Sequence, residues 1–417
     1  MKGYSSLRRS ALAAATLGSA TVLLASACAS SGGASGTGTS VKTVVIGSIN
    51  DFSGAQGPVG VDTGRGIEQL VAEVNAAGGI KSLGGAKIVV KKFDTQTNPD
   101  LGATEATQAV NAKVNIVIGG DVSDTVIAGT NVTARANIPW IDPGGSDSEI
   151  TARGFNNVFQ TLPNTSQAAQ GYYDVMKTAC EKFGCGAHPT MAVAVSDTSY
   201  GTALDAAFTA LNTAGYFNIV TKVSYPDTTT DFSSIAARLA SDNPDIIYNE
   251  GYPADGLSLA QDFATTVKTN AKVFLGVPLY QSLASQLGTK ADGVLTYGAP
   301  STLFAGMPAE FTTQNTIFQK KWGYPMSLAA VQGYVDAALA YQAFEQSGST
   351  NGVKLAATLH RIQLTHAEGN LFPVNTLSFL PNGAMANPYL FEVQIQDGKA
   401  VGVFPLNIAT AKLIAYR

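Results

Sequence analysis

The chain has 417 residues, with 26 basic and 30 acidic side chains and a formal net charge of −4. This mildly acidic balance gives no sign of a nucleic-acid partner, because nucleic acids are bound through clustered positive charge. At about 150 residues per domain, the length predicts two domains, each large enough for its own hydrophobic core.

The start of the chain predicts an export signal. Lys2, Arg8 and Arg9 form a basic segment, and residues 11–25 form an apolar run. This run is shorter than the ~20 residues that a membrane span needs. A basic segment followed by such an apolar run is typical of a secretory signal peptide. We therefore expect residues 1–27 to be a signal peptide, with general secretory and twin-arginine export both open.

Cys28 directly follows three small residues, which is the order of a bacterial lipobox. We therefore expect lipidation of Cys28, followed by a flexible linker over residues 28–42 that is rich in Ser, Gly and Thr. Plain secretion is the alternative, because the usual leucine lies one place early, at Leu24. No later stretch is apolar enough to span a bilayer, so we expect membrane contact through the lipid anchor only.

Short β-branched runs alternate with helical patterns through the first part of the chain. Strands are expected at residues 44–46, 87–93, 115–118 and 138–141, and helices around 67–74, 100–112 and from 123 onward. Strands separated by helices of this length need right-handed crossovers. The pattern therefore predicts a parallel sheet with helices on both faces.

The same alternation starts again near residue 191. Strands are expected at residues 191–195, 218–224, 245–248 and 272–275, with helices around 204–211 and 232–239. Two such series predict an α/β fold of two doubly wound, Rossmann-like lobes. Near the C-terminus we expect helices near 309–322 and 328–346, and a hairpin of strands 389–396 and 400–404 around Asp397-Gly398.

Cys180 and Cys185 are the remaining two of the three cysteines. In an oxidising compartment they could close a small loop, so we expect a disulfide between them. A reactive or metal-binding pair is the alternative, with only His188 nearby as a further ligand. We expect no metal site and no cofactor.

Three loops that follow expected strands are rich in glycine and hydroxyl groups. They contain Ser53, Ser123 and Ser146. In open α/β sheets, ligands bind at the carboxyl ends of the strands, where helix N-termini suit anionic groups. Helix capping is the alternative role for Ser123 and Ser146. Because three such loops fall in one lobe, we favour a ligand site.

Motifs of common enzymes are absent from the sequence. It contains no Gly-x-Ser-x-Gly, no His-Glu-x-x-His and no Walker lysine motif, and no Gly-x-Gly-x-x-Gly follows a strand. We therefore expect a binding protein without catalytic residues rather than a secreted enzyme.

Several segments, taken in chain order, resemble the type I solute-binding proteins of bacterial ABC importers, in particular the branched-chain amino acid (Leu/Ile/Val) group. The similar segments are the Ser-Gly loop at 51–54, the Asn-Ala-Ala-Gly-Gly-Ile helix end at 75–80, the turn at 93–99, and the loops at 143–146, 197–201 and 250–253. A late match is residues 332–337. The resemblance covers residues 43–405.

This resemblance implies two lobes joined by three crossovers, near residues 162, 293 and 383. The first lobe would contain residues 43–162 and 294–382. The second would contain residues 163–293 and 383–417. A solute would be held in the cleft between them as a hinge closes.

The resemblance also implies roles for single residues. Ser123 and Ser146 would grip the carboxylate of the solute, and Gly145 would offer its carbonyl to a donor such as an ammonium. Tyr200 and Tyr252 would close over the ligand from the second lobe. One lobe would thus fix polar groups, while the other adds aromatic area and excludes water.

Two departures leave the class of solute open. The amino acid binders have a Gly-Pro-Glu segment, whose Glu contacts the ammonium of the ligand. In this chain the corresponding residues, 276–278, are Gly-Val-Pro, so the Glu is missing. In addition, Val59 stands where an aromatic residue is expected. Glu250 could meet the ammonium from a different angle, as could Asp121 or Asp147. An α-amino acid and a carboxylate or amide without the ammonium both remain open.

The function implied by the resemblance is that of an extracytoplasmic, monomeric lipoprotein. It would deliver a small polar solute to the transmembrane subunits of an ABC permease. A sensor whose closed form is recognised by a signalling receptor would use the same closure, and is the alternative.

Overall fold

The computed structural model describes residues 41–276, 280–298 and 300–416. All of them belong to one unit of the chain, Ser40–Arg417. The expected signal peptide, Cys28 and most of the expected linker lie outside the described residues. Within the described part, no helix has both the length and the apolar character that crossing a bilayer requires.

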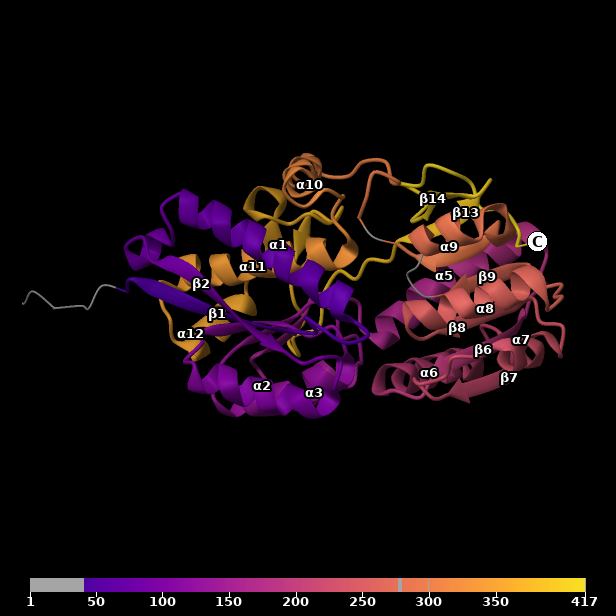
Figure 1. The fold of residues 1–417 in the computed structure, drawn as a ribbon, viewed down its shortest axis with the longest axis horizontal. Coiled ribbons are helices and arrows are strands. Elements are labelled where there is room, and N and C mark those ends of the chain that lie inside the picture. The colour runs from indigo at the N-terminus through magenta and orange to yellow at the C-terminus, as the bar shows by residue number, and fades with distance from the viewer. Residues whose placement is uncertain (1–40, 277–279, 299, 417) are drawn as a thin grey trace, which may run out of the picture. The chain divides into compact units, whose positions relative to one another are not determined.

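The first lobe is built on a five-stranded sheet in the order β2-β1-β3-β4-β5 (Figure 1). Its strands are β1 (Thr43–Asn50), β2 (Lys87–Asp94), β3 (Ile116–Gly119), β4 (Trp140–Asp142) and β5 (Val158–Gln160). All four pairings are parallel. The connecting helices are α1 (Gly57–Ala76), α2 (Pro99–Asn111), α3 (Ser123–Arg135) and α4 (Glu149–Ala152). Parallel neighbours need such crossovers, so the expected alternation of strands and helices is confirmed.

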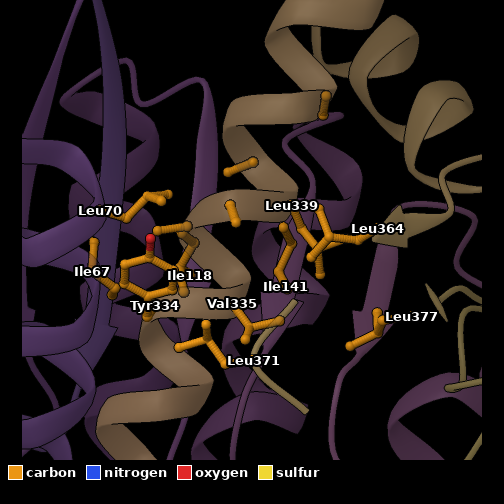
Figure 2. Close-up of a cluster of buried hydrophobic side chains, with 14 of the residues drawn as sticks. Ile67, Leu70, Ile118, Ile141, Tyr334, Val335, Leu339, Leu364, Leu371 and Leu377 are labelled. Atoms are coloured by element: carbon orange, nitrogen blue, oxygen red, sulfur yellow. The ribbon is translucent and has the colours of Figure 1, made fainter. Parts of the chain in front are cut away.

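Helices cover both faces of this sheet (Figure 1). On one face α1 packs with α11 (Leu328–Ser347), and on the other lie α2 and α3. Ile67 and Leu70 of α1 lie beside Tyr334 of α11, in the same buried cluster as Val335, as Figure 2 shows. Helices α10 (Ala309–Trp322) and α12 (Gly352–Leu359), a two-stranded sheet of β11 (Leu364–Thr365) and β12 (Thr376–Leu377), and the 3-10 turns Lys81–Leu83 and His366–Glu368 complete this lobe.

The second lobe is built on a seven-stranded sheet in the order β14-β13-β10-β9-β8-β6-β7. Its strands are β6 (Thr190–Ser196), β7 (Asn218–Tyr225), β8 (Ile246–Glu250), β9 (Val273–Gly276), β10 (Val294–Tyr297), β13 (Glu392–Gln396) and β14 (Lys399–Phe404). Strands β6 to β10 are mutually parallel, and β13 is antiparallel to β10 and β14. The structure therefore has the expected α/β fold with two lobes.

Helices also cover both faces of the second sheet. On one face lie α5 (Thr165–Phe183) and α6 (Ser199–Thr213). On the other lie α7 (Ser233–Ala240), α8 (Pro253–Thr265) and α9 (Tyr280–Gln286), followed by the 3-10 turn Gly288–Ala291. Cys180 near the end of α5 forms a disulfide with Cys185, with their Cα atoms 4.9 Å apart.

One expected lobe boundary differs from the strand pairing. The sequence expectation assigned residue 294 onward to the first lobe, but Val294–Tyr297 forms β10 and pairs with β9 and β13 of the second sheet. All four of its residues are buried, so this short segment completes the second core before the chain leaves it. The expected crossovers near 162 and 383 stay predictions.

The C-terminal hairpin follows from local backbone chemistry. Asp397 and Gly398 have φ values of 51° and 70° between β13 and β14. Positive φ at both positions is what a tight hairpin with the right-handed strand twist requires, and Asp-Gly satisfies it at low cost. This turn sets the antiparallel pairing of β13 with β14, and β13 in turn pairs with β10.

Candidate functional site

A cavity of about 370 Å³ lies where the carboxyl ends of strands from both sheets face the start of α11. Its first-lobe wall includes residues that follow β1, β3 and β4, and its second-lobe wall includes residues at the ends of β8 and β10. Carboxyl ends of parallel strands are the usual ligand position in open α/β sheets. The volume is within the ~300–1,000 Å³ of small-molecule sites.

The first-lobe wall is organised by the hydroxyl of Ser123. Its Oγ accepts hydrogen bonds from the backbone N–H groups of Ser146 and Asp147, both at 3.1 Å. A hydroxyl has two acceptor lone pairs and one hydrogen, so Ser123 retains that hydrogen to donate. Ser123 and Ser146 both line the cavity.

The loop after β4 is also held by Asp142. Its Oδ1 accepts from the N–H groups of Gly144 at 3.1 Å and Gly145 at 2.8 Å. Burial raises the pKa of Asp142 well above its ordinary value, although these two bonds act in the opposite direction.

The helix N-caps here are Val122 and Ser148, so Ser123 and Ser146 are not caps.

Two expected ligand residues are not brought to the cavity. The Oγ of Ser53 donates to Asp94 Oδ2 at 2.7 Å, so the Ser-Gly loop is tied to the end of β2. The carbonyl of Gly145 accepts from Gln160 Nε2 at 2.9 Å, and Gly145 is buried. Its neighbour Gly144 lines the cavity, whereas Gly145 does not. Both positions are held by polar partners from other segments of the chain, Asp94 and Gln160, which the sequence pattern did not reveal.

The second-lobe wall brings together Tyr200, Glu250 and Tyr252, whose contact with a ligand stays a prediction. Glu250 ends β8 and is 3% exposed. Its Oε2 accepts a hydrogen bond from the hydroxyl of Tyr248. Burial raises the pKa of Glu250 to about 7, while hydrogen bonds from Tyr248 and Tyr200 act in the opposite direction.

The first lobe contributes Asp62 and Asp121 as lining carboxylates. Asp62 pairs with Arg65 at 3.3 Å and accepts from Ser327 Oγ at 2.6 Å. Asp121 accepts from the N–H of Asp51 and from Thr63 Oγ1, both at 3.1 Å. Burial raises the pKa of Asp121 to about 7. Both carboxylates therefore already have partners within the first lobe.

No lysine, arginine or histidine occurs among the described residues that line the cavity. Nor does any group of three or more His, Cys, Asp or Glu in the described ranges have an arrangement that could hold a metal ion. The first-lobe wall therefore offers the hydroxyls of Ser123 and Ser146 beside two carboxylates that already have partners, and the second-lobe wall offers the Glu250 carboxyl and tyrosine hydroxyls.

The periplasmic binding protein family has a sequence model that matches residues 43–399. The chain belongs to this family. Membership implies an extracytoplasmic location and a role in binding solutes. A relative is the Leu/Ile/Val-binding protein homolog 8 of Brucella abortus (strain 2308), 27% identical over 383 residues that cover 89% of this chain and 92% of the relative.

Two solved structures show the same fold. One is the branched-chain amino acid transporter substrate-binding protein of Streptococcus pneumoniae in complex with isoleucine, with 20% identity, a TM-score of 0.72, and coverage of 87% of this chain and 99% of that chain. The other is an ABC transporter solute-binding protein of R. palustris in complex with benzoate, with 21% identity, a TM-score of 0.72, and coverage of 89% and 97%. The resemblance to type I solute-binding proteins is therefore confirmed.

This periplasmic binding protein also lines its cavity with residues that the sequence did not single out. Tyr172 of α5, Tyr297 of β10 and Gln332 of α11 all lie on the wall. Gln332 falls within a segment similar to the family, which could have indicated it. Tyr297 lies in a strand too short to show a period, and Tyr172 follows the pattern of a core aromatic residue. Val277 and Pro278, at the family's ammonium position, lie outside the described residues.

Proposed function

We propose that this periplasmic binding protein holds a small zwitterionic solute, of the amino acid type, and delivers it to the transmembrane subunits of an ABC importer. The observation that carries the proposal is the chemistry of the cavity wall. Hydroxyls of Ser123 and Ser146 lie on the first-lobe wall and the carboxyl of Glu250 on the second-lobe wall. A solute with one anionic and one cationic group matches both ends.

The first-lobe end is suited to a carboxylate. Ser123 begins α3, where unpaired N–H groups and the helix dipole favour negative charge. Because its two lone pairs are already used, its hydroxyl hydrogen is available to a ligand oxygen. Ser146 adds a second hydroxyl on the same wall.

A carboxylate alone fits less well than a zwitterion. The described lining residues include Asp62, Asp121 and Glu250 but no cationic side chain. Placing a further anion beside buried carboxyls is costly unless the ligand also brings a positive group. The benzoate complex of the R. palustris neighbour shows that this fold also accommodates a carboxylate without an ammonium. Such carboxylates are the second candidate class of solute.

The membrane attachment belongs to the same proposal. Lipidation of Cys28 would tether the protein to the outer face of the cell membrane, and residues 28–42 would form the linker between the lipid anchor and the first lobe. A monomer would then meet the permease by diffusion at the membrane. Labelling with a lipid precursor tests this: Cys28→Ser should abolish labelling and release the protein from membranes.

Isothermal titration calorimetry against amino acids, monocarboxylates and amides tests the solute class. We expect amino acids to bind, and monocarboxylates of the same length to bind at least about tenfold more weakly, because they lack a partner for the acidic end. Absence of binding across the panel, with a cooperatively folded protein, would contradict the proposed function.

A further inference from the structure

At the second-lobe end of the cavity, the described residues leave buried polar groups without hydrogen-bond partners. Tyr297 lines the cavity, is only 8% exposed, and its hydroxyl has no hydrogen-bond partner among the described residues. Directly across the antiparallel pair from Tyr297 is Glu392 of β13. Residues opposite one another in such a pair project from the same face of the sheet. Glu392 therefore stands beside Tyr297, behind the cavity wall.

Glu392 is fully buried, and neither of its carboxyl oxygens has a hydrogen-bond partner among the described residues. Burial raises the pKa of Glu392 well above its ordinary value, and the nearby charge of Glu250 raises it further. The pKa of Tyr297 is also raised, first by burial and then by Glu392 and Glu250. These three groups thus lie close enough to influence one another.

An unpaired buried carboxyl is costly, and two carboxyls sharing one site are more so. No lysine, arginine or histidine lines this cavity in the described part of the chain. A positive group brought by the ligand would satisfy Glu250 and the hydroxyl of Tyr297, and its charge would stabilise an ionised Glu392. Ammonium suits this role because it has three donors and no acceptor.

The two ends of the cavity are built on different lobes. Ser123 and Ser146 belong to the first lobe, whereas Glu250 and Tyr297 belong to strands of the second. The lining also contains apolar side chains, among them Leu162, Ala168, Leu328, Ala329 and Leu390. An α-amino acid carries its ammonium on the carbon next to the carboxylate. A ligand whose two charges are separated by a carbon chain can place one charge at each wall and its methylene groups against these apolar side chains.

We propose that the second-lobe end of the cavity, lined by Glu250 and Tyr297 with Glu392 behind the wall, is a subsite for an ammonium group at the end of a carbon chain. The solute class is then an amino acid with a terminal ammonium, rather than an aliphatic α-amino acid. This inference rests on the proposed function, since it takes the first-lobe end as the carboxylate site. Glu250 contacts the ammonium, and Glu392 adds negative charge from its position behind the cavity wall.

The test is isothermal titration calorimetry at pH 8 with 5-aminopentanoate, pentanoate and leucine. The first two differ only by the terminal ammonium. We expect 5-aminopentanoate to bind at least about tenfold more tightly than either of the others, because only it provides a buried charge pair at the second-lobe end. L-Lysine, which adds an α-ammonium, serves as a second probe with a terminal ammonium.

Two variants assign the subsite to its residues. Glu250→Gln and Glu392→Gln should each weaken 5-aminopentanoate binding by about tenfold or more, while changing pentanoate binding less than about twofold. Glu181→Gln on α5, an ion-paired and largely exposed acid of the same lobe, is the matched control and should change neither. Circular dichroism establishes that each variant is folded. Should Glu392→Gln fail to fold, Glu250→Gln alone still decides the question.

The outcomes separate this inference from the proposed function. If pentanoate or leucine binds as tightly as 5-aminopentanoate, or if Glu250→Gln leaves 5-aminopentanoate binding unchanged, the ammonium subsite is wrong while solute binding stands. If neither these probes nor any solute of the wider panel binds to the folded protein, both are wrong.

Discussion

The hydroxyls of Ser123 and Ser146 lie on the same wall of the cavity but have different tasks. Ser123 Oγ holds the backbone of the Ser146 loop through two hydrogen bonds of 3.1 Å, whereas Ser146 contributes a hydroxyl to the wall. Removing the first hydroxyl therefore disturbs both the loop and the ligand contact. Removing the second affects the ligand contact alone.

We therefore expect Ser146→Ala to weaken solute binding by ~1–3 kcal/mol with little change in thermal stability, because one polar ligand contact is lost. Ser123→Ala should weaken binding at least as much and should also lower Tm, because two N–H groups lose their acceptor. Calorimetric titration and differential scanning calorimetry measure the two effects. Unchanged affinity in both variants would show that the carboxylate lies elsewhere.

The buried carboxyl of Glu250 makes cation binding depend on pH. Burial raises its pKa to about 7, so it is largely protonated below that pH in the unliganded protein. The groups that face it are the tyrosines Tyr172 of α5, Tyr200 of α6 and Tyr248 of β8, together with Tyr297 of β10 and Glu392 of β13. A ligand ammonium is attracted much more strongly by the ionised form than by the neutral form.

We therefore expect the affinity for 5-aminopentanoate to rise between pH 5.5 and 8, by up to about tenfold per pH unit below the pKa. Glu250→Gln should flatten this dependence. Titrations at half-unit pH steps measure it. An affinity that stays constant over the range would mean that Glu250 does not meet the cation.

The same carboxyl has the opposite effect on the stability of the unliganded protein. Its folded-state pKa of about 7 exceeds the ordinary value of 4.5, so folding favours the neutral form. This stabilisation is present below about pH 4.5 and is lost as the pH rises through about 7. We expect Tm to fall between pH 5 and 8, and to fall less in Glu250→Gln. Equal slopes in both proteins would contradict the raised pKa.

At the scale of elements, α1 and α11 approach closely because glycines lie at their contact. A Cβ on Gly66 would lie 2.0 Å from the backbone oxygen of Ala330, and one on Gly333 would lie 2.1 Å from that of Thr63. Backbone atoms cannot rotate away as a side chain can. The pair holds Gln332 of α11 on the cavity wall, so this packing also positions the site.

Gly333→Ala should accordingly lower the free energy of unfolding by ~1–3 kcal/mol, because the added methyl group overpacks the helix contact. Gly57→Ala in α1 is the control, since its Cβ would come no closer than 3.7 Å to Phe52. That change should leave stability nearly unaltered or raise it slightly. Urea denaturation measures both, and equal stability of the two variants would contradict the close contact.

Most helices and strands could be predicted from the sequence, including the short strands β3, β4 and β9, whereas β5 and β10 were not. Ala309–Trp322 was predicted to the residue, and the hairpin around Asp397-Gly398 followed from its turn residues. Strands β5 and β10 have 3 and 4 residues, too few for a repeat to be recognised. Because strand β10 was not expected, the lobe boundary was placed at residue 294, and Tyr297 was not recognised as a candidate site residue.

The candidate site was predicted in the same uneven way. Residues at the ends of recognisable strands, such as Ser123 and Glu250, do line the cavity. Ser53 and Gly145 do not, because Asp94 and Gln160 take up their polar groups. Contacts of this kind join segments far apart in the chain, and no local pattern reports them. That Glu392 has no hydrogen-bond partner among the described residues likewise becomes visible only in three dimensions.

At the scale of the whole molecule, both lobes contribute to one cavity. A solute that is contacted from both sides stabilises the conformation in which the two walls are close together. We therefore expect small-angle X-ray scattering to show a smaller radius of gyration when a saturating solute is added. An unchanged radius with bound solute would indicate a rigid molecule instead.

The central claim is that the cavity between the Ser146 loop and Glu250 binds a solute without altering it chemically. A crystal structure of the protein soaked or grown with 5-aminopentanoate tests this most directly. The account predicts an intact ligand, with its carboxylate within hydrogen-bond distance of Ser123 and Ser146 and its ammonium beside Glu250. A ligand bound elsewhere, or one converted to a different compound in the cavity, would contradict it.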